Sequence, residues 1–376
     1  MKAKFKVATI LTLEQDHLEQ LSFTSWHYRT LLAIKKCRTQ ALGGHIDACT
    51  CCKKIHISYN SCRNRHCPNC QGHKQEQWIQ SRVDELLNVP YFHVVFTLPS
   101  EFNRFCLLYG KQVYNALFAS AGKTIKAFSG KELGVTPGMI AVLHTWGQNL
   151  SLHPHLHCIV PNGGVTKAGY WKRGKQGKKF LFSVKAMSSM FRAKFIAEIR
   201  KQQLPVPQKT YDKVFKKNWV IYAKKPFGKP AYVVEYLGRY SHKIAISNHR
   251  ILAINKTKKQ VTFSAKDYKK DGRKTTITLS TKDFIKRFQL HILPKGFTKI
   301  RHYGFLSSSW KKEKLPRLQA CVLNKPFAPI TKIKQPKTYL KRCPSCKKGE
   351  LITLLTFDCR GPPKEYLIYL RNEIKI

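Results

Sequence analysis

Residues 152–161 read Leu-His-Pro-His-Leu-His-Cys-Ile-Val-Pro, and this stretch decides how the middle of the chain is interpreted. If residues 155–160 form a β-strand, His155 and His157 project from one face, because side chains alternate along a strand. Two neutral imidazoles and a third nearby group make a divalent-metal site with open coordination positions. We therefore expect His155 and His157 to bind a metal ion. The candidates for the third ligand are Gln148, His153 and His144.

Strand-like and helix-like patterns alternate around these histidines. The sequence predicts strands at 91–98, 140–147 and 155–160 and helices within 101–130 and near 185–202. Residues 148–154 form a gap of hairpin length, so the two strands that flank it are expected to be antiparallel. The fold class that follows is α+β, with an antiparallel sheet and flanking helices.

A second motif follows further along the chain, where residues 233–240 read Val-Val-Glu-Tyr-Leu-Gly-Arg-Tyr. On a helix, Tyr236 and Tyr240 share one face, one turn apart. A tyrosine hydroxyl is a good phosphoryl acceptor, because the phosphotyrosine conserves the energy of the broken phosphodiester. Two tyrosines at this spacing are also common core aromatics. Their occurrence in the same chain as the His155 and His157 motif favours a role as nucleophiles.

A cysteine-rich segment lies before the predicted sheet. Cys49-x-x-Cys52 and Cys67-x-x-Cys70 are two knuckles separated by a loop, a spacing typical of a tetrahedral zinc site. We expect these four cysteines to bind one structural Zn²⁺. The surplus residues of this segment are Cys51, Cys62, His45, His56 and His66, of which Cys62 and His66 are additional candidate ligands, so ligand swapping or a second metal ion stays open.

The charge of the chain indicates a polyanionic partner. Its 376 residues include 69 Lys and Arg against 20 Asp and Glu, a formal net charge of +49, while 43% hydrophobic residues suffice for a buried core. Nucleic acid is the expected partner. The residues expected to contact DNA are Arg63, Arg65, Arg239 and Lys243. The sequence has no apolar run of membrane-spanning length and no cleavable leader pattern, so we expect no membrane contact and a cytoplasmic, nucleoid-associated protein whose cysteines stay reduced.

Six stretches together resemble the two-tyrosine HUH transposases of rolling-circle insertion sequences, the group founded on insertion sequence ninety-one. They are CRTQALGGH (37–45), YNSCRNRHCPNCQ (59–71), HVVFTLP (93–99), HTWGQNLSLHPHLHCIVPNGG (144–164), YLGRYSHKIAISNHRI (236–251) and FIKRFQLHILPKGFTKIRHYG (284–304). The resemblance covers most of the chain.

The resemblance implies an HUH endonuclease-type sheet behind a small helical and zinc-binding domain. It also implies His155 and His157 as ligands of Mg²⁺ or Mn²⁺, and Tyr236 and Tyr240 as nucleophiles. The implied function is that of a transposase that nicks and rejoins single-stranded DNA at insertion-sequence ends through a 5′-phosphotyrosine intermediate. Some relatives keep only one of the two tyrosines, so the need for both stays open.

The expected domains are a helical and zinc-binding domain (1–88), an HUH catalytic domain (89–310) and a basic linker with a C-terminal cysteine knuckle (311–376). The knuckle is Cys343-x-x-Cys346, with Cys359 further on. Only three cysteines occur there, so the fourth ligand of a separate zinc site is missing from this segment.

Four other functions are open at this point. A non-enzymatic zinc-ribbon nucleic-acid binder explains the charge and the cysteines but not the His and Tyr motifs. A tyrosine recombinase is suggested by Arg301-His302-Tyr303, and a metal-dependent hydrolase by His153, His155 and His157. A transposase with an acidic triad is disfavoured, because the 20 Asp and Glu show no triad pattern.

Overall fold

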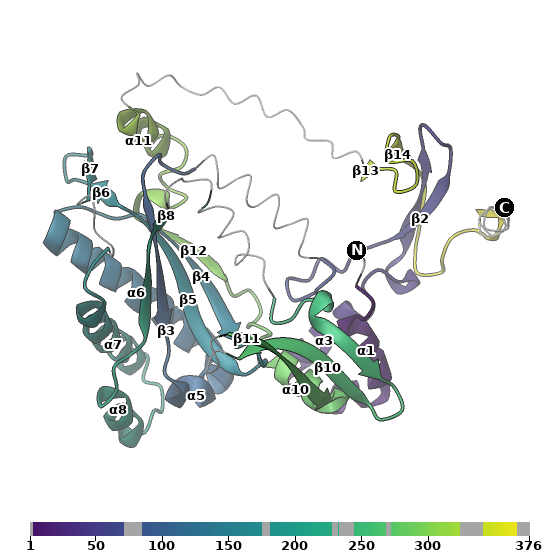
Figure 1. Cartoon of the computed structure of the whole chain (residues 1–376), viewed down its shortest axis with the longest axis horizontal. Coiled ribbons are helices and arrows are strands. Elements are labelled where there is room, and N and C mark those ends of the chain that lie inside the picture. The colour runs from purple at the N-terminus through teal and green to yellow at the C-terminus, as the bar shows by residue number, and fades with distance from the viewer. Residues whose placement is uncertain are drawn as a thin grey trace.

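A computed structural model describes residues 3–70, 85–174, 181–227, 232, 244–267, 272–323 and 341–366. Over these residues the chain combines helices with sheets in which every registered strand pair is antiparallel (Figure 1). The predicted α+β class, an antiparallel sheet with flanking helices, is confirmed.

The largest sheet has five strands in the order β12-β4-β5-β3-β8. Its strands are β3 (Tyr91–Thr97), β4 (Met139–Trp146), β5 (Leu152–Pro161), β8 (Ile221–Phe227) and β12 (Ile300–Tyr303). The turn between β4 and β5 is as short as predicted, since Trp146 pairs with Leu152 across the hairpin. β5, which carries the histidine motif, therefore lies at the centre of the sheet.

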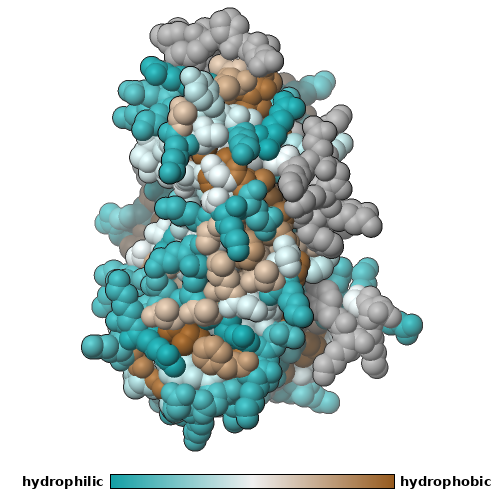
Figure 2. Space-filling model, turned by 90° about the vertical axis from the view of Figure 1, so that its left-hand side faces the viewer, coloured by the Kyte–Doolittle hydropathy of each residue, from teal (hydrophilic) through white to brown (hydrophobic). Residues whose placement is uncertain are grey.

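One face of this sheet is covered by helices. Alternate residues such as Phe96 of β3, Leu143 of β4 and Leu156 of β5 belong to the same buried core as the helices. These helices are α5 (Asn103–Leu108), α6 (Gly110–Leu133), α7 (Val184–Lys201) and α8 (Gln208–Phe215). Figure 1 shows α6 and α7 on one side of the sheet, and the outer side of that layer is mainly hydrophilic (Figure 2).

The opposite face is apolar only at one end of its strands. There Ile140, Val142 and Ile159 pack with Leu315 and Leu318 of α11 (Lys314–Val322). This helix lies at the start of the segment expected to be a basic linker and cysteine knuckle (311–376). The helix forms because its two leucines, one turn apart, are buried in this small core. The other end of the same face carries histidines.

A second core joins elements from both halves of the chain. Leu11, Leu31 and Ile34 of the N-terminal helices share it with Phe263 and Phe284. The elements of this unit are α1 (Val7–Leu13), α2 (Leu18–Leu21), α3 (Ser25–Lys35), β9 (Ile251–Asn255), β10 (Gln260–Asp267), β11 (Arg273–Ser280) and α10 (Thr281–Gln289). Residues on both sides of the predicted 88/89 boundary therefore pack together, while the division into three domains stays a prediction.

A four-stranded sheet brings the two ends of the chain together. Its order is β13-β14-β1-β2, with β1 (Gly44–Cys49), β2 (Ile55–Tyr59), β13 (Lys341–Arg342) and β14 (Glu350–Phe357). A two-stranded sheet of β6 (Gly163–Val165) and β7 (Trp171–Arg173) completes the strands. The cysteine knuckles lie at the ends of the four-stranded sheet.

Candidate functional site

Three histidines meet on the open face of the central sheet. His144 of β4 lies directly across from His155 of β5, and His157 follows two residues later on the same face. The three side chains can each offer one ligand nitrogen, and these nitrogens all lie within 4.8 Å of one another. The ring centroids of His144 and His157 are 4.5 Å apart, and those of His155 and His157 are 4.9 Å apart. Of the three candidates for the third ligand, the structure brings His144 to the pair.

The other two candidates lie differently. His153 is exposed; its backbone carbonyl accepts a hydrogen bond from His155, and its ring lies beside the His155 ring with centroids 5.1 Å apart. Gln148 lies in the β4–β5 turn, where its carbonyl oxygen accepts a hydrogen bond of 2.5 Å from the Arg250 guanidinium. Neither belongs to the histidine group found among the described residues.

Hydrogen bonds orient two of the three imidazoles. His155 Nδ1 donates to the His153 carbonyl oxygen at 2.6 Å, and His157 Nδ1 lies 2.9 Å from His93 Nε2. Because Nδ1 is engaged in both rings, Nε2 is the atom through which each ring would bind an ion. Histidine ligands of protein metal sites show this arrangement, in which the second ring nitrogen bonds to a neighbouring group and fixes the tautomer. The residues present therefore fit a divalent metal ion.

His93 is a site residue that the sequence analysis did not identify. It belongs to β3, is 2% exposed, and its ring stacks on that of His157 with an interplanar angle of 8°. The signal was present in the expected strand 91–98, where alternation places residues 91, 93 and 95 on one face. The sequence did not show which of these residues would lie beside the histidines of β5, because that depends on the register between the two strands.

A basic and aromatic wall lies next to the histidines. The Trp146 ring stacks on His144 with centroids 4.5 Å apart, and Lys299 Nζ lies 5.1 Å from the centre of the Trp146 ring. Desolvation, together with the nearby Arg65, lowers the pKa of Lys299 to about 7. Arg65 and Lys299 line one small cavity with Trp146. Arg65 supplies the lasting positive charge of this wall, because the lowered pKa leaves Lys299 only partly protonated at neutral pH.

The cysteines form two groups instead of one. Each group places four thiol sulfurs within 4.8 Å of one another. The first consists of Cys37, Cys62, Cys67 and Cys70, and the second of Cys49, Cys52, Cys343 and Cys346. The expected single set of Cys49, Cys52, Cys67 and Cys70 is therefore corrected.

The β1–β2 hairpin explains the separation. Cys49 and Cys52 lie at its tip, next to the pair Ala48 and Ile55, while Cys62 follows the base, where Gly44 pairs with Tyr59. Five strand residues separate tip from base by roughly 15 Å. Sequence spacing alone could not reveal this distance. Cys62, an additional candidate, is indeed part of the first group.

The remaining predicted residues fall into two sets. His66 belongs to neither cysteine group; its Nε2 accepts a hydrogen bond from the Leu293 amide at 3.3 Å, and burial keeps its pKa well below the usual value. Arg65 donates to the carbonyl oxygens of Pro294 and Phe297, whereas Arg63 is exposed. Tyr236, Arg239, Tyr240 and Lys243 lie outside the described residues. Within the residues that the structure describes, no helix has the length and apolar character to cross a bilayer.

Two regions of the chain match profiles of known protein families. Residues 10–98 match the family described as "Transposase zinc-binding domain", and residues 138–314 match the one described as "Putative transposase". The first region contains the whole Cys37 group, and the second contains His144, His155 and His157.

Two curated proteins are similar to the chain over most of its length. "Putative transposase y4qJ" of Sinorhizobium fredii is 38% identical over 382 residues, which cover 93% of this chain and 95% of that protein. "Transposase for insertion sequence element IS801" of Pseudomonas savastanoi pv. phaseolicola is 28% identical, over 80% of this chain and 75% of that protein. No solved structure matches the chain significantly. The chain therefore belongs to the IS91 family of insertion-sequence transposases, which carry an N-terminal zinc-binding domain.

Proposed function

We propose that this transposase nicks and rejoins single-stranded DNA at insertion-sequence ends by metal-assisted attack of a tyrosine, and so drives rolling-circle transposition. Tyr236 or Tyr240 is the nucleophile, and His144, His155 and His157 bind the activating ion. The protein would act on DNA of the nucleoid in the cytoplasm. The observation that carries the proposal is the group of three histidines on one sheet face, with the Nδ1 atoms of His155 and His157 already engaged.

The reaction replaces one phosphodiester bond of the DNA by a phosphodiester bond to tyrosine, so the bond energy is conserved. The tyrosine oxygen bonds to the scissile phosphorus, the bond from phosphorus to the 3′-oxygen breaks, and the tyrosine proton ends on the released 3′-hydroxyl. The strand on the 3′ side of the cut stays attached to the protein through its 5′-phosphate as a phosphotyrosine. A 3′-hydroxyl can later attack the same phosphorus and release the tyrosine. His144, His155 and His157 would hold a divalent ion, which would polarise the phosphate and offset the charge that develops during the displacement. Histidine ligands favour Mn²⁺ over Mg²⁺, because Mg²⁺ prefers oxygen ligands.

The position of Ile244 supports a tyrosine near the histidines. Ile244 lines the same small cavity as Thr145 and Trp146, which directly follow His144 on β4. Tyr240 precedes Ile244 by four residues, a length that spans at most about 14 Å of chain. The tyrosine that the sequence assigns as a nucleophile is therefore close along the chain to a residue beside the His144 end of β4.

The wall of positive charge beside the histidines supports a phosphate substrate. Lys299 and Arg65 line a cavity with Trp146, whose ring stacks on His144, and the full chain carries a formal charge of +49. A polyanion such as DNA offsets this charge, whereas a small neutral substrate does not.

Two of the other functions considered are less well supported by the structure. Tyr303 donates a hydrogen bond to the Phe118 carbonyl oxygen at 3.1 Å, and the Arg301 guanidinium lies 4.2 Å from the centre of the Phe118 ring. These contacts give both residues packing roles, which weakens the tyrosine recombinase reading. His153 is exposed and is replaced by His144 in the histidine group, which weakens a hydrolase built on His153.

We also assign a structural Zn²⁺ to the first cysteine group. Cys37 Sγ and Cys62 Sγ lie 3.5 and 3.6 Å from Cys70 Sγ. Four thiolates at the corners of a tetrahedron with Zn–S bonds of about 2.3 Å are roughly 3.8 Å apart. Such a closed site holds a fold together and leaves no position for a substrate.

The test is covalent capture of labelled single-stranded DNA with Mg²⁺ or Mn²⁺. The parent chain is expected to form a metal-dependent protein–DNA adduct, and the double variant Tyr236→Phe/Tyr240→Phe is expected to form none. The single variants show which tyrosine attacks first. Tyr232→Phe, an exposed tyrosine of the same region, is the matched control and should keep the adduct.

The result that would overturn the nucleophile assignment is an adduct that persists in the double variant. Binding of DNA with no adduct from any variant, with or without metal, would instead favour the non-enzymatic zinc-ribbon binder. His155→Ala/His157→Ala should retain DNA binding and lose the adduct, because the substitution removes metal ligands and leaves the basic residues in place.

A further inference from the structure

The second cysteine group takes two thiols from each end of the chain. Cys49 Sγ lies 3.6 Å from Cys346 Sγ, and Cys52 Sγ lies 3.7 Å from Cys343 Sγ. These distances are close to the roughly 3.8 Å expected between thiolates around one tetrahedral Zn²⁺. They are far longer than a disulfide bond, which measures about 2.05 Å. The spacing therefore corresponds to four ligands of one ion.

The two knuckles of this group have the same backbone structure. The residue after the second cysteine has a left-handed conformation in each, with φ of 58° at Lys53 and 60° at Lys347. The amide of Lys53 donates to the Cys49 carbonyl oxygen at 3.2 Å, and the amide of Lys347 donates to that of Cys343 at 2.9 Å. Non-glycine residues adopt this conformation only when the surrounding structure requires it. Both turns are thus built to present their sulfurs in the same way.

Backbone amides point at the sulfurs of this group. The amides of Cys51 and Cys52 donate to Cys49 Sγ at 3.4 Å, and the amide of Gly349 donates to Cys346 Sγ at 3.3 Å. Hydrogen bonds of this kind favour the thiolate form, which is the form that binds metal. Outside the four ligands, His56 Nε2 lies 3.4 Å from Cys343 Sγ. The sulfurs therefore have supporting polar contacts as well as the correct spacing.

Gly349 permits the close approach of the two knuckles. A Cβ at this position would lie 2.5 Å from Cys49 Sγ and 2.6 Å from Cys51 Cβ. No real side chain tolerates these distances without displacing the knuckle. Glycine is therefore required where the C-terminal turn meets the N-terminal one.

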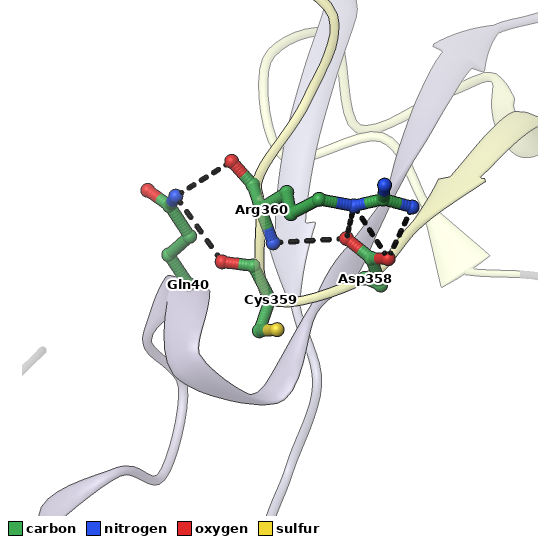
Figure 3. A network of polar contacts seen from close by, with 4 residues as sticks. All are labelled: Gln40, Asp358, Cys359 and Arg360. Carbon is green, nitrogen blue, oxygen red and sulfur yellow. Dashed lines mark hydrogen bonds and ion pairs between the residues drawn. The ribbon is translucent and has the colours of Figure 1, made fainter.

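Contacts beyond the cysteines fix the same pairing. β14 pairs with β1 from Gly44 to Cys49, and Thr353 Oγ1 donates to Asp47 Oδ1 at 2.7 Å. Figure 3 shows that the Gln40 amide reaches the backbone carbonyl oxygens of Cys359 and Arg360, at 3.3 and 2.9 Å. In Figure 1, β13 and β14 lie beside β2, far from the helical layer. The C-terminal segment is thus part of the N-terminal zinc-binding unit.

We propose that Cys49, Cys52, Cys343 and Cys346 bind a second structural Zn²⁺, which fastens the C-terminal segment to the zinc-binding domain. The family matches end at residue 314, so they assign no role to Cys343 and Cys346. The first group is complete within residues 37–70, whereas the second is only half complete until the C-terminal knuckle joins it. The complete unit holds two zinc ions.

The test measures zinc bound to the purified full-length chain by elemental mass spectrometry. In a His155→Ala/His157→Ala background, which keeps the histidines from contributing, we expect about two zinc ions per chain. Cys343→Ser/Cys346→Ser should reduce this to about one, as should Cys37→Ser/Cys62→Ser for the first group. The matched control is Cys321→Ser/Cys359→Ser, two exposed cysteines in neither group, which should retain about two.

A second variant leaves all four sulfurs in place. Gly349→Ala should release the second zinc ion at a lower chelator concentration than the parent, while the exposed neighbour Lys348→Ala should behave like the parent. Cobalt substitution gives an independent signal, because tetrahedral thiolate sites absorb strongly, and Cys343→Ser/Cys346→Ser should halve this absorption.

Three results would overturn the proposal. They are one zinc ion in the parent, undiminished zinc in Cys343→Ser/Cys346→Ser, and a disulfide between the two knuckles in protein purified under reducing conditions. Each result is independent of DNA cleavage, so failure here and failure of the proposed function are distinguishable.

Discussion

At the scale of single residues, His93 is a buried residue of β3 that contacts the metal-binding residue His157. It is buried, and its Nε2 is within hydrogen-bond distance of His157 Nδ1. Groups that orient a metal-binding histidine in this way usually contribute a factor of about 10–100 to metal affinity. His93 is therefore a positioning residue: it acts on the ion through His157.

We predict that His93→Leu weakens Mn²⁺ binding about 10–100-fold, because His157 loses the partner that fixes its tautomer. Calorimetric titration of the purified chain with Mn²⁺ measures this change, and cleavage of single-stranded DNA should require correspondingly more metal. His93→Gln, which keeps a hydrogen-bonding group, should restore most of the affinity.

The matched control for this change is His153→Ala. The hydrogen bond that His155 Nδ1 donates goes to the backbone carbonyl of His153, and the exposed His153 ring lies beside His155 but is not in the histidine group of the described residues. Removal of this ring should therefore leave Mn²⁺ affinity close to that of the parent. Equal losses in His93→Leu and His153→Ala would contradict a specific role for His93.

At the scale of elements, the sequence predicted the strands and helices around the site but not their register. Alternation along β5 places His155 and His157 on one face, and the short turn before it predicts the hairpin with β4. The choice of His144 over Gln148 and His153 depends on cross-strand pairing, which places His144 opposite His155. For the cysteines, local spacing predicted each Cys-x-x-Cys pair but not which pairs share a site. Cys49 and Cys52 share theirs with Cys343 and Cys346, about 290 residues away in the sequence.

Helix α10 gives an element-scale prediction for stability. Ser280 caps the helix: its Oγ accepts a hydrogen bond from the Asp283 amide at 3.0 Å and donates to Asp283 Oδ2 at 2.7 Å. Ser280→Ala should lower the free energy of unfolding of this unit by about 1 kcal/mol, because an N-terminal amide loses its acceptor. Urea unfolding followed by circular dichroism measures the change.

Ser280→Asn is the comparison for this prediction, since asparagine is an equally good capping residue, has an amide that can donate to Asp283, and should stay within a few tenths of a kcal/mol of the parent. A loss of stability in Ser280→Asn as large as that in Ser280→Ala would show that capping does not explain the effect.

At the scale of the whole molecule, the basic charge and the pairing of distant segments both extend over the length of the chain. The excess of 69 basic over 20 acidic residues is spread along the entire chain. The domains expected from the sequence were contiguous segments, whereas the packing joins residues 7–34 with 245–292 and residues 44–49 with 350–357. Such long-range pairings have no local signature, because each segment is only half of an apolar core or a sheet.

We predict that binding of single-stranded DNA weakens steeply with salt. If about six phosphates are neutralised, log K should fall with log salt at a slope of about −4, which is a loss of roughly 300-fold between 50 and 200 mM. Fluorescence anisotropy with a labelled oligonucleotide at several salt concentrations gives the slope. A slope near zero would contradict an electrostatic basis for DNA binding.

The pairing of β14 with β1 also fixes the order in which the molecule can be completed during synthesis. The Cys37 group emerges from the ribosome early, but the tip of the β1–β2 hairpin must wait for almost the entire chain before Cys343 and Cys346 are made. A chain that stops prematurely, for example after a frameshift in the mobile element, would retain its histidines and tyrosines yet leave two thiols of that hairpin exposed. Completion of this one sheet thus requires residues 350–357 to be present.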